Sequence, residues 1–237
     1  MSLADHLREL RRRLIISVIA ILVGGFVAYF LYGHILTFLL HPYCSIQHQG
    51  NRSQPCSLVT LDPIDKLTIR LKIAFFGGFV LALPIVLWQT WRFITPGLHP
   101  REKRYAVPFV AASSVLFAFG AFVALSTLPL ALRFFQSVGG SQLSSFYAPD
   151  PYLRLVTLMI IVYGLGFEFP VVLVALLSAR VLSTAKLRKW RRYAFLGIVG
   201  ASAIFTPSSD PVSMFALAIP LYVFYEASIL IGRVLKR

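Results

Sequence analysis

Few acidic side chains are available for chemistry in this chain of 237 residues, where nine Asp and Glu residues stand against 23 Lys and Arg residues. Glu9 and Glu102 both lie among cations in the sequence. Each could pair with a neighbour, as Glu9 could with Arg12 or Arg13 at helical spacing, a contact worth a few tenths of a kcal/mol. Composition alone favours that pairing. The alternative is that they receive a cationic segment of a partner, because a carboxylate binds an arginine through two parallel hydrogen bonds.

Glu168 is another candidate, because it interrupts the apolar run GLGFEFPVV. A carboxyl group at mid-membrane depth is costly unless it is protonated, paired or facing a wet cavity, so it is a functional candidate by default. A structural role is the alternative: Pro170 leaves the carbonyl of Gly166 without its helical amide, and a protonated Glu168 could donate to such an acceptor. Glu226, in LYVFYEA, is expected to pack against a basic neighbour.

Motifs for catalysis are missing from the sequence. It contains no HExxH for zinc, no glycine-rich phosphate loop and no GxSxG, and its five histidines are scattered. We therefore predict that the protein is not an enzyme and that it has neither a metal site nor a cofactor.

The composition places the chain in lipid. Hydrophobic residues make up 57% and charged residues 14%, with a mean hydropathy of +0.75, which leaves too little polar surface for a soluble globule of this size. We predict an all-α integral membrane protein with a single transmembrane domain, 1–237. Its apolar runs, mostly near the roughly 20 residues that a span requires, are six: 15–32, 69–93, 105–126, 153–177, 193–205 and 212–231.

The distribution of charge gives the orientation. An even number of spans puts both termini on one side, and 17 of the 23 Lys and Arg residues lie on that side, against six on the other. Cytoplasmic loops carry the excess of basic residues, so both termini are expected in the cytoplasm. A nucleic-acid binder would instead gather its basic residues on one face of a soluble scaffold, and we exclude that class of partner.

The surrounding elements must position the acidic candidates. The segment 2–14 places leucines at three- and four-residue spacing and predicts an amphipathic helix along the membrane surface. The thirteen residues of span 193–205 cover roughly 20 Å against about 30 Å of hydrocarbon, so the bilayer thins there or the turn lies below the outer surface. In that turn, TPSSDP, Asp210 and Pro211 are typical of an N-cap and a first helical position.

The longer loops, about 34–68 and 127–152, are expected to form an extracytoplasmic cap. Cys44 and Cys56 both fall in the first, where an oxidising compartment would permit a disulfide bond. Closing so short a loop would contribute up to about 3 kcal/mol. We favour this bond, and two unpaired thiols are the alternative.

Four motifs occur in order along the chain: HLRELRRRL, PIVLWQTWRFITPGLHPREKR, GFEFPVV, and TPSSDP followed by AIPLYVFYE. In this arrangement the chain resembles the TatC family, the receptor subunit of the twin-arginine protein translocase. The resemblance implies a curved, glove-shaped bundle with short fifth and sixth helices, in the cytoplasmic membrane of a prokaryote. It implies recognition of signal peptides with paired arginines on folded cargo, and export driven by the protonmotive force.

The same resemblance assigns site residues. Signal-peptide binding is implied for Glu9, Arg13, Phe93, Pro96, Gly97, Leu98, Glu102 and Arg104. Glu168 matches the family's intramembrane glutamate, Asp210 the acid of the last external turn, and Glu226 the glutamate of the final span. The single-span subunits TatA and TatB would dock near spans five and six, and copies of this chain would assemble together. One departure lies at the start of the sixth span, where some relatives have a glutamine that contacts the partner helix and this sequence has Met214 nearby. That polar contact would be absent here or moved to Thr206.

A different class of function remains open beside this one. A proton-coupled small-solute transporter could use Glu168 as its proton site. An intramembrane enzyme is a third class, which the missing nucleophile and metal motifs disfavour.

Overall fold

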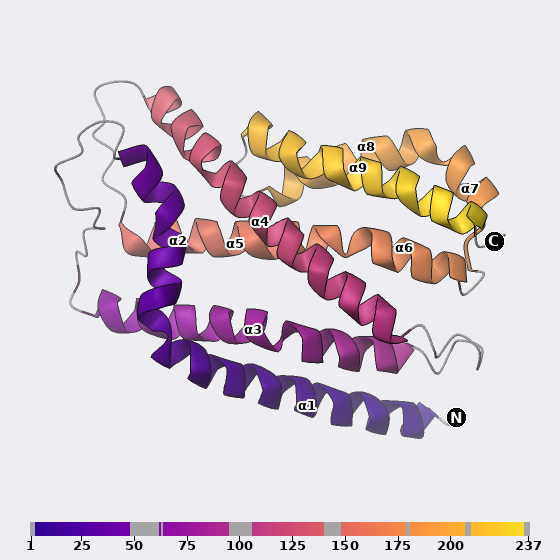
Figure 1. Ribbon diagram of the computed structural model, residues 1–237, viewed down its shortest axis with the longest axis horizontal. Coiled ribbons are helices and arrows are strands. Elements are labelled where there is room, and N and C mark those ends of the chain that lie inside the picture. Colours follow the sequence, from indigo (N-terminus) through magenta and orange to yellow (C-terminus); the bar gives the residue numbers. More distant parts are fainter. Residues whose placement is uncertain are drawn as a thin grey trace. The chain divides into compact units, whose positions relative to one another are not determined.

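The computed structural model describes residues 3–47, 62, 64–94, 106–139, 148–178, 181–206 and 210–234. Every regular element within these ranges is a helix, which confirms the all-α prediction for the described part (Figure 1). The helices are α1 (Leu3–Phe30), α2 (Tyr32–Gln47), α3 (Asp65–Ile94), α4 (Ala106–Gly139), α5 (Pro149–Phe167), α6 (Phe169–Ser178), α7 (Thr184–Lys189), α8 (Arg191–Phe205) and α9 (Pro211–Val234).

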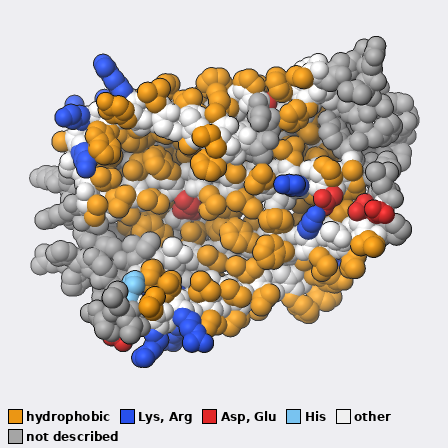
Figure 2. All heavy atoms as spheres, turned by 180° about the vertical axis from the view of Figure 1, so that it is seen from behind, with side chains coloured by type: hydrophobic (Ala, Val, Ile, Leu, Met, Phe, Trp, Pro, Cys, Tyr) orange, Lys and Arg blue, Asp and Glu red, His pale blue; other side chains and the backbone are white. Residues whose placement is uncertain are grey.

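In the described part, α1, α3, α4, α9 and the consecutive α5 and α6 are long and apolar enough to cross a membrane. Large apolar side chains are exposed along them, such as Leu22 and Phe26, each with about two thirds of its area accessible. Figure 2 shows hydrophobic side chains over most of the described surface of one face, as contact with lipid requires. The predicted fifth span corresponds to α8, whose 15 residues fall short of a full crossing. The sixth corresponds to α9, whose 24 residues are long enough to cross, so the expectation of a short sixth helix was wrong. Six spans and a glove shape therefore stay predictions.

The predicted boundaries differ from the structure mainly on the predicted extracytoplasmic side. The first part of the loop expected at 34–68 is the apolar helix α2. The Pro, Ser and Gln residues of this segment are typical of loops, which explains why the helix was not predicted. Helix α4 continues past residue 126 to Gly139, with Pro129 inside it.

The N-terminal amphipathic segment is continuous with the first span, so a separate helix along the membrane surface was wrong. Helix α1 runs without interruption from Leu3 to Phe30. Neither Gly nor Pro occurs before Gly24, and the hydroxyl of Ser17 donates to the carbonyl of Arg13 at 3.1 Å across the junction. The basic turns are thus a rigid extension of the span.

By its contacts the chain divides into two compact units. Unit 1 is Met1–Phe38 with Ile64–Val115, and unit 2 is Leu39–Pro63 with Leu116–Arg237. The divisions fall inside the continuous helices α2 and α4. A single transmembrane domain stays a prediction.

In unit 1, α1 and α3 pack side by side through glycine (Figure 1). A Cβ atom built at Gly78 would lie 2.4 Å from the backbone nitrogen of Gly25 and 2.8 Å from the carbonyl oxygen of Ile21, and one at Gly24 would lie 2.7 Å from the carbonyl oxygen of Gly78. Small residues let membrane helices approach this closely. This packing places the N-terminal turns of α1, which are predicted to lie in the cytoplasm, beside the C-terminal end of α3.

In unit 2, the predicted fourth span is broken at Glu168. Helix α5 ends at Phe167, the N–H of Glu168 bonds to the carbonyl of Leu165 at 3.1 Å, and α6 begins with Phe169 and Pro170. Proline has no N–H to continue the helical ladder, which explains why the break occurs here. Glu168 lies at this interruption, between the two helices.

Candidate functional site

The first candidate site is the α1–α3 surface of unit 1, which we define by His6, Glu9, Arg13, Arg92 and Phe93. The Nε atom of Arg13 donates to Oε1 of Glu9 at 3.1 Å, and the Nη2 atom of Arg13 contacts the same oxygen. One of the two pairings expected for Glu9 is therefore present. Glu9 precedes the apolar part of α1, and the hydrogen bond from Arg13 lowers the pKa of its carboxyl below the ordinary value.

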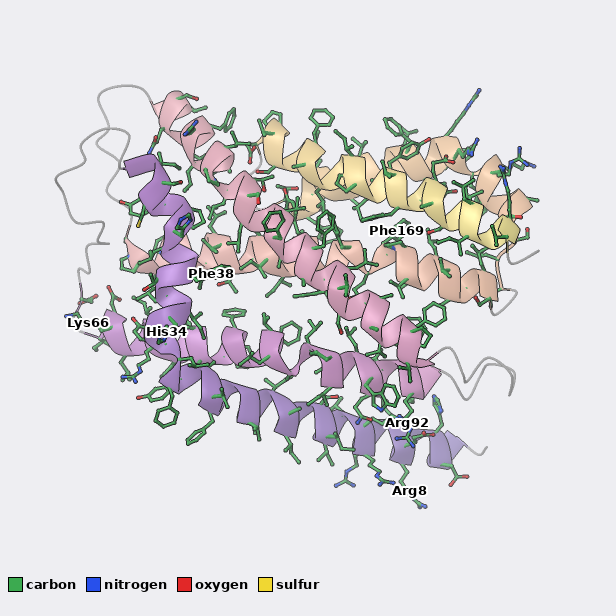
Figure 3. The ribbon with its side chains drawn as sticks, in the orientation of Figure 1. Arg8, His34, Phe38, Lys66, Arg92 and Phe169 are labelled. Atoms are coloured by element: carbon green, nitrogen blue, oxygen red, sulfur yellow. The ribbon has the colours of Figure 1, made fainter. Side chains whose placement is uncertain are left out.

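The end of α3 completes this surface. The rings of His6 and Phe93 pack together with centroids 4.5 Å apart and planes tilted by 31°, and the charge of Arg92 acts on Glu9. Figure 3 shows Arg92 on the side of α3 that faces α1 and Arg8 on the opposite side of α1. The carboxylate thus lies where α1 meets α3, among cations from both helices.

The remaining predicted receptor residues, Pro96, Gly97, Leu98, Glu102 and Arg104, lie outside the described residues. The helices on either side of them are in contact, since Trp91 of α3 stacks on Phe109 of α4 with centroids 4.9 Å apart and planes 19° from parallel. The structure brings Glu9, Arg13 and Phe93 together and leaves the others as predictions.

The second candidate site is a cavity of about 670 Å³ in unit 2, the α5–α8 cavity. It is lined by α5 and α6 on one side and α8 on the other, with Leu217 and Leu221 of α9 completing the lining; Phe169, labelled in Figure 3, belongs to it. Glu168 is among the lining residues, with Oε1 of its carboxyl group buried, and Ser202 is 1% exposed. An apolar cavity with so few polar groups suits an apolar segment that carries one hydrogen-bonding group.

Polar contacts hold Thr206, at the end of α8, and Asp210, at the start of α9. The N–H of Ser213 donates to Oδ1 of Asp210 at 2.7 Å, and α9 begins at Pro211, which confirms the predicted N-cap. The hydroxyl of Thr206 donates to the carbonyl of Ser202 at 2.5 Å. Thr206 and Asp210 are 2% and 1% exposed, whereas Met214 is partly buried. These partners explain Thr206 and Asp210 as structural residues within this chain.

Glu226 packs against a basic neighbour, as predicted. The Nη2 atom of Arg191, at the start of α8, lies 2.5 Å from its Oε2, and the hydroxyl of Tyr222 lies 3.4 Å from its Oε1. The pair joins the start of α8 to α9 and is partly exposed, which suits a structural ion pair.

Cys44 lies on α2 and takes part in a disulfide bond. Cys56, its predicted partner, lies outside the described residues, so the pairing stays a prediction. No group of three or more His, Cys, Asp or Glu residues within the described ranges could hold a metal ion.

Two residues, one in the α1–α3 surface and one that bonds α5 to α9, were not predicted from the sequence. His6 was counted among scattered histidines, although its place three residues before Glu9 puts both on one helical face. Tyr163 was read as part of an apolar run, yet it is fully buried and bonds to α9. A buried tyrosine requires a partner for its hydroxyl, and this was the available signal.

Comparison with known proteins identifies the family. The family model described as "Sec-independent protein translocase protein (TatC)" matches residues 5–220. The protein of that name from Frankia casuarinae is 39% identical to this chain, over 98% of this chain and 65% of the relative. The one from Aquifex aeolicus is 37% identical, over 100% of this chain and 97% of the relative. The chain thus spans less than two thirds of the Frankia relative and nearly all of the Aquifex one.

The fold agrees with that match. A solved structure named "Crystal Structure of Twin Arginine Translocase Receptor- TatC" superposes with a TM-score of 0.76 at 36% identity, over 98% of this chain and 100% of the other. The same receptor crystallised "in DDM" gives a TM-score of 0.78 over 96% and 99%. With its apolar helices, this chain belongs to the TatC family of Sec-independent protein translocase proteins, which are multi-pass membrane proteins of bacteria.

Proposed function

We propose that this chain is the receptor subunit of a twin-arginine translocase and that its α1–α3 surface binds the paired arginines of signal peptides on folded cargo. The arginines would meet Glu9 and, from the segment that follows α3, Glu102. Arg13, Phe93, Pro96, Gly97, Leu98 and Arg104 would complete the binding surface. The termini would lie in the cytoplasm, where cargo is made, as the excess of basic residues on that side suggests.

The observation that carries this proposal is the position of Glu9 at the junction of α1 and α3. Its carboxylate is ion-paired with Arg13 and lies close enough to α3 for the charge of Arg92 to act on it. A second guanidinium can bind a carboxylate that already accepts from one, because each oxygen has two acceptor positions. The His6 and Phe93 rings beside it offer an apolar contact for residues next to the arginines.

Peptide binding to the purified protein tests the proposal. A peptide with an Arg pair should bind at least ten times more tightly than the same peptide with a Lys pair, because an ammonium cannot form the two parallel hydrogen bonds. Glu9→Gln should weaken binding of the Arg peptide and reduce its preference over the Lys peptide. Asp5→Gln removes an acid from the same helix and serves as the control. Equal affinity for both peptides would refute the assignment.

We also propose that the α5–α8 cavity receives the transmembrane helix of a TatA- or TatB-type subunit, with Glu168 bonding to a polar group on it. The cavity is lined by the short helix α8 and is almost entirely apolar, so a membrane helix is a suitable occupant. Met214 lies on α9 beyond this lining, and Thr206 is already bonded to Ser202. Glu168 is therefore the polar contact that we favour.

Photocrosslinking in membranes tests this docking. A photoreactive residue at Leu165 or Val172, which line the cavity, should crosslink a small single-span protein. One at Leu158, similarly exposed on α5 but outside the lining, should not. Glu168→Gln keeps one donor and acceptor and should retain more crosslinking than Glu168→Ala. If liposomes with this chain alone instead carried a proton-coupled solute flux that Glu168→Gln abolished, the transporter function would be favoured.

A further inference from the structure

A dense group of cations lies at the junction of α7 and α8, outside both sites described above. We define the α7–α8 basic cluster as Lys186, Arg188, Lys189, Arg191 and Arg192, five cations within seven residues. In the described part of the chain, an acidic partner is seen for Arg191, which pairs with Glu226. The side chains of the other four are exposed to the surroundings of the chain.

These cations stand on a well-anchored helix. Ser183 caps α7 by accepting the N–H of Lys186 at 3.3 Å, and Leu187, on the inner face, is 3% exposed. The hydroxyl of Tyr225 on α9 donates to the carbonyl of Leu187 at 2.7 Å. A Cβ atom at Gly232 would lie 2.6 Å from Cγ2 of Thr184, so α9 approaches α7 closely. The direction in which the cluster faces is therefore fixed by packing.

Aromatic side chains accompany the cations. The indole of Trp190 is 47% exposed, with Nζ of Lys186 4.8 Å from its ring centroid, and Tyr193 is 74% exposed. Directly after them, Phe195 and Leu196 are 50% and 66% exposed on α8. Exposed Trp and Tyr between a cationic segment and an apolar helix surface are typical of the membrane–water interface.

We infer that the α7–α8 basic cluster is a binding site for the phosphate headgroups of anionic phospholipids. Arginine binds a phosphate through two parallel hydrogen bonds, and lysine contributes a compact charge. Trp190 and Tyr193 lie against the glycerol region, and the acyl chains follow the exposed face of α8. A nucleic acid or an acidic protein would use the cations and leave this adjoining apolar surface uncovered, so a lipid fits the whole surface best.

Such a site has a consequence for α8. This helix is too short for a full crossing, and it forms one wall of the α5–α8 cavity. Phospholipids bound at its basic end fix the depth at which it lies. The bound lipid thereby sets the position of this wall relative to the bilayer.

Photoreactive phosphatidylglycerol, added to the protein in mixed micelles, tests the site. The crosslinked peptide identified by mass spectrometry should contain residues 186–193, and a phosphatidylcholine probe with the same chains should label it far less. Replacing Lys186, Arg188 and Lys189 by Gln should weaken the apparent affinity on the order of 100-fold, since each basic residue near an anionic surface contributes about a factor of five. Lys189→Gln alone should weaken it about fivefold.

A matched variant and a soluble competitor decide among the alternatives. Replacing Arg8, Arg11 and Arg12 by Gln removes the same charge from α1 and should leave the labelling of 186–193 in place. Glycerol phosphate has the headgroup chemistry without the chains and should not compete at the concentration at which the lipid binds. The proposal would be overturned by an equal loss of labelling in both triple variants, by labelling elsewhere in the chain, or by competition from glycerol phosphate. If the triple variant of the cluster fails to fold, the single variant Lys189→Gln decides.

Discussion

The hydroxyl of Tyr163 on α5 donates a hydrogen bond of 2.6 Å to the backbone carbonyl of Ser213 on α9, and both residues are fully buried. The N–H of the same Ser213 donates to Oδ1 of Asp210 at 2.7 Å. The first turn of α9 is thus bonded to α5 through the carbonyl of Ser213 and to the side chain of Asp210 through the N–H of Ser213. This arrangement fixes the α8–α9 hairpin to the helix that precedes Glu168.

Tyr163→Phe should lower the free energy of unfolding by about 1 kcal/mol, because a buried hydrogen bond is lost while the ring is kept. Thermal unfolding in detergent measures the change. Tyr193→Phe, at a position 74% exposed, is the matched control and should be neutral within about 0.5 kcal/mol. Equal effects at the two positions would mean that the bond to Ser213 contributes nothing.

Asp210→Ala should cost about 1 kcal/mol and Asp210→Asn much less, because Asn caps a helix about as well as Asp. Hydrogen exchange at the first turn of α9 reports the cap directly: the Ser213 amide should exchange faster in the Ala variant than in the Asn variant. If Asn proved as damaging as Ala, the carboxylate charge rather than the cap would be the important feature of Asp210.

Gly78→Ala should destabilise the protein by roughly 1–3 kcal/mol, because its methyl group would lie 2.4 Å from the backbone of Gly25 and would force α1 away from α3. Gly33→Ala adds the same methyl where no atom lies within 4 Å and should be neutral or slightly stabilising. Peptide binding should fall in the Gly78 variant alone, since separation of the helices disrupts the surface around Glu9. A well-folded Gly78 variant with unchanged binding would contradict this.

The ion pair between Arg191 and Glu226 should contribute little by itself, about 0.2–1 kcal/mol, because both side chains are partly exposed. The double variant Arg191→Glu with Glu226→Arg should recover most of the stability lost in either single variant. Thermal unfolding of all four proteins completes the double-mutant cycle. A coupling energy near zero would show that Glu226 is retained for another reason.

The sequence predicted those features that depend on local patterns. The effect of Pro170 on the helix around Glu168 and the N-cap at Asp210 follow from neighbouring prolines. The basic partner of Glu226 follows from the excess of basic residues on the predicted cytoplasmic side. Each depends on chemistry within a few residues or on a strong compositional bias.

Features that depend on contacts between helices were missed. Glycine packing between Gly25 and Gly78 requires knowledge of which helix faces are paired. Among the described glycines, Gly33, Gly197 and Gly200 have no such contact, although their residue type is the same. The bond from Tyr163 to Ser213 joins residues fifty positions apart. The continuity of α1 was misjudged because a basic amphipathic segment has the same periodicity whether it lies on the membrane or extends from it.

Arg13→Gln should raise the pKa of Glu9 towards its ordinary value, because the hydrogen bond from Arg13 is the largest influence that lowers it. In the parent protein the carboxylate therefore stays charged to a lower pH than in the variant. Titration of side-chain carboxyl carbons by NMR in micelles should show the Glu9 midpoint at higher pH in Arg13→Gln. Arg12→Gln removes an equal charge from the next position and should leave the midpoint nearly unchanged, so equal shifts in both variants would indicate a general charge effect in place of the specific bond.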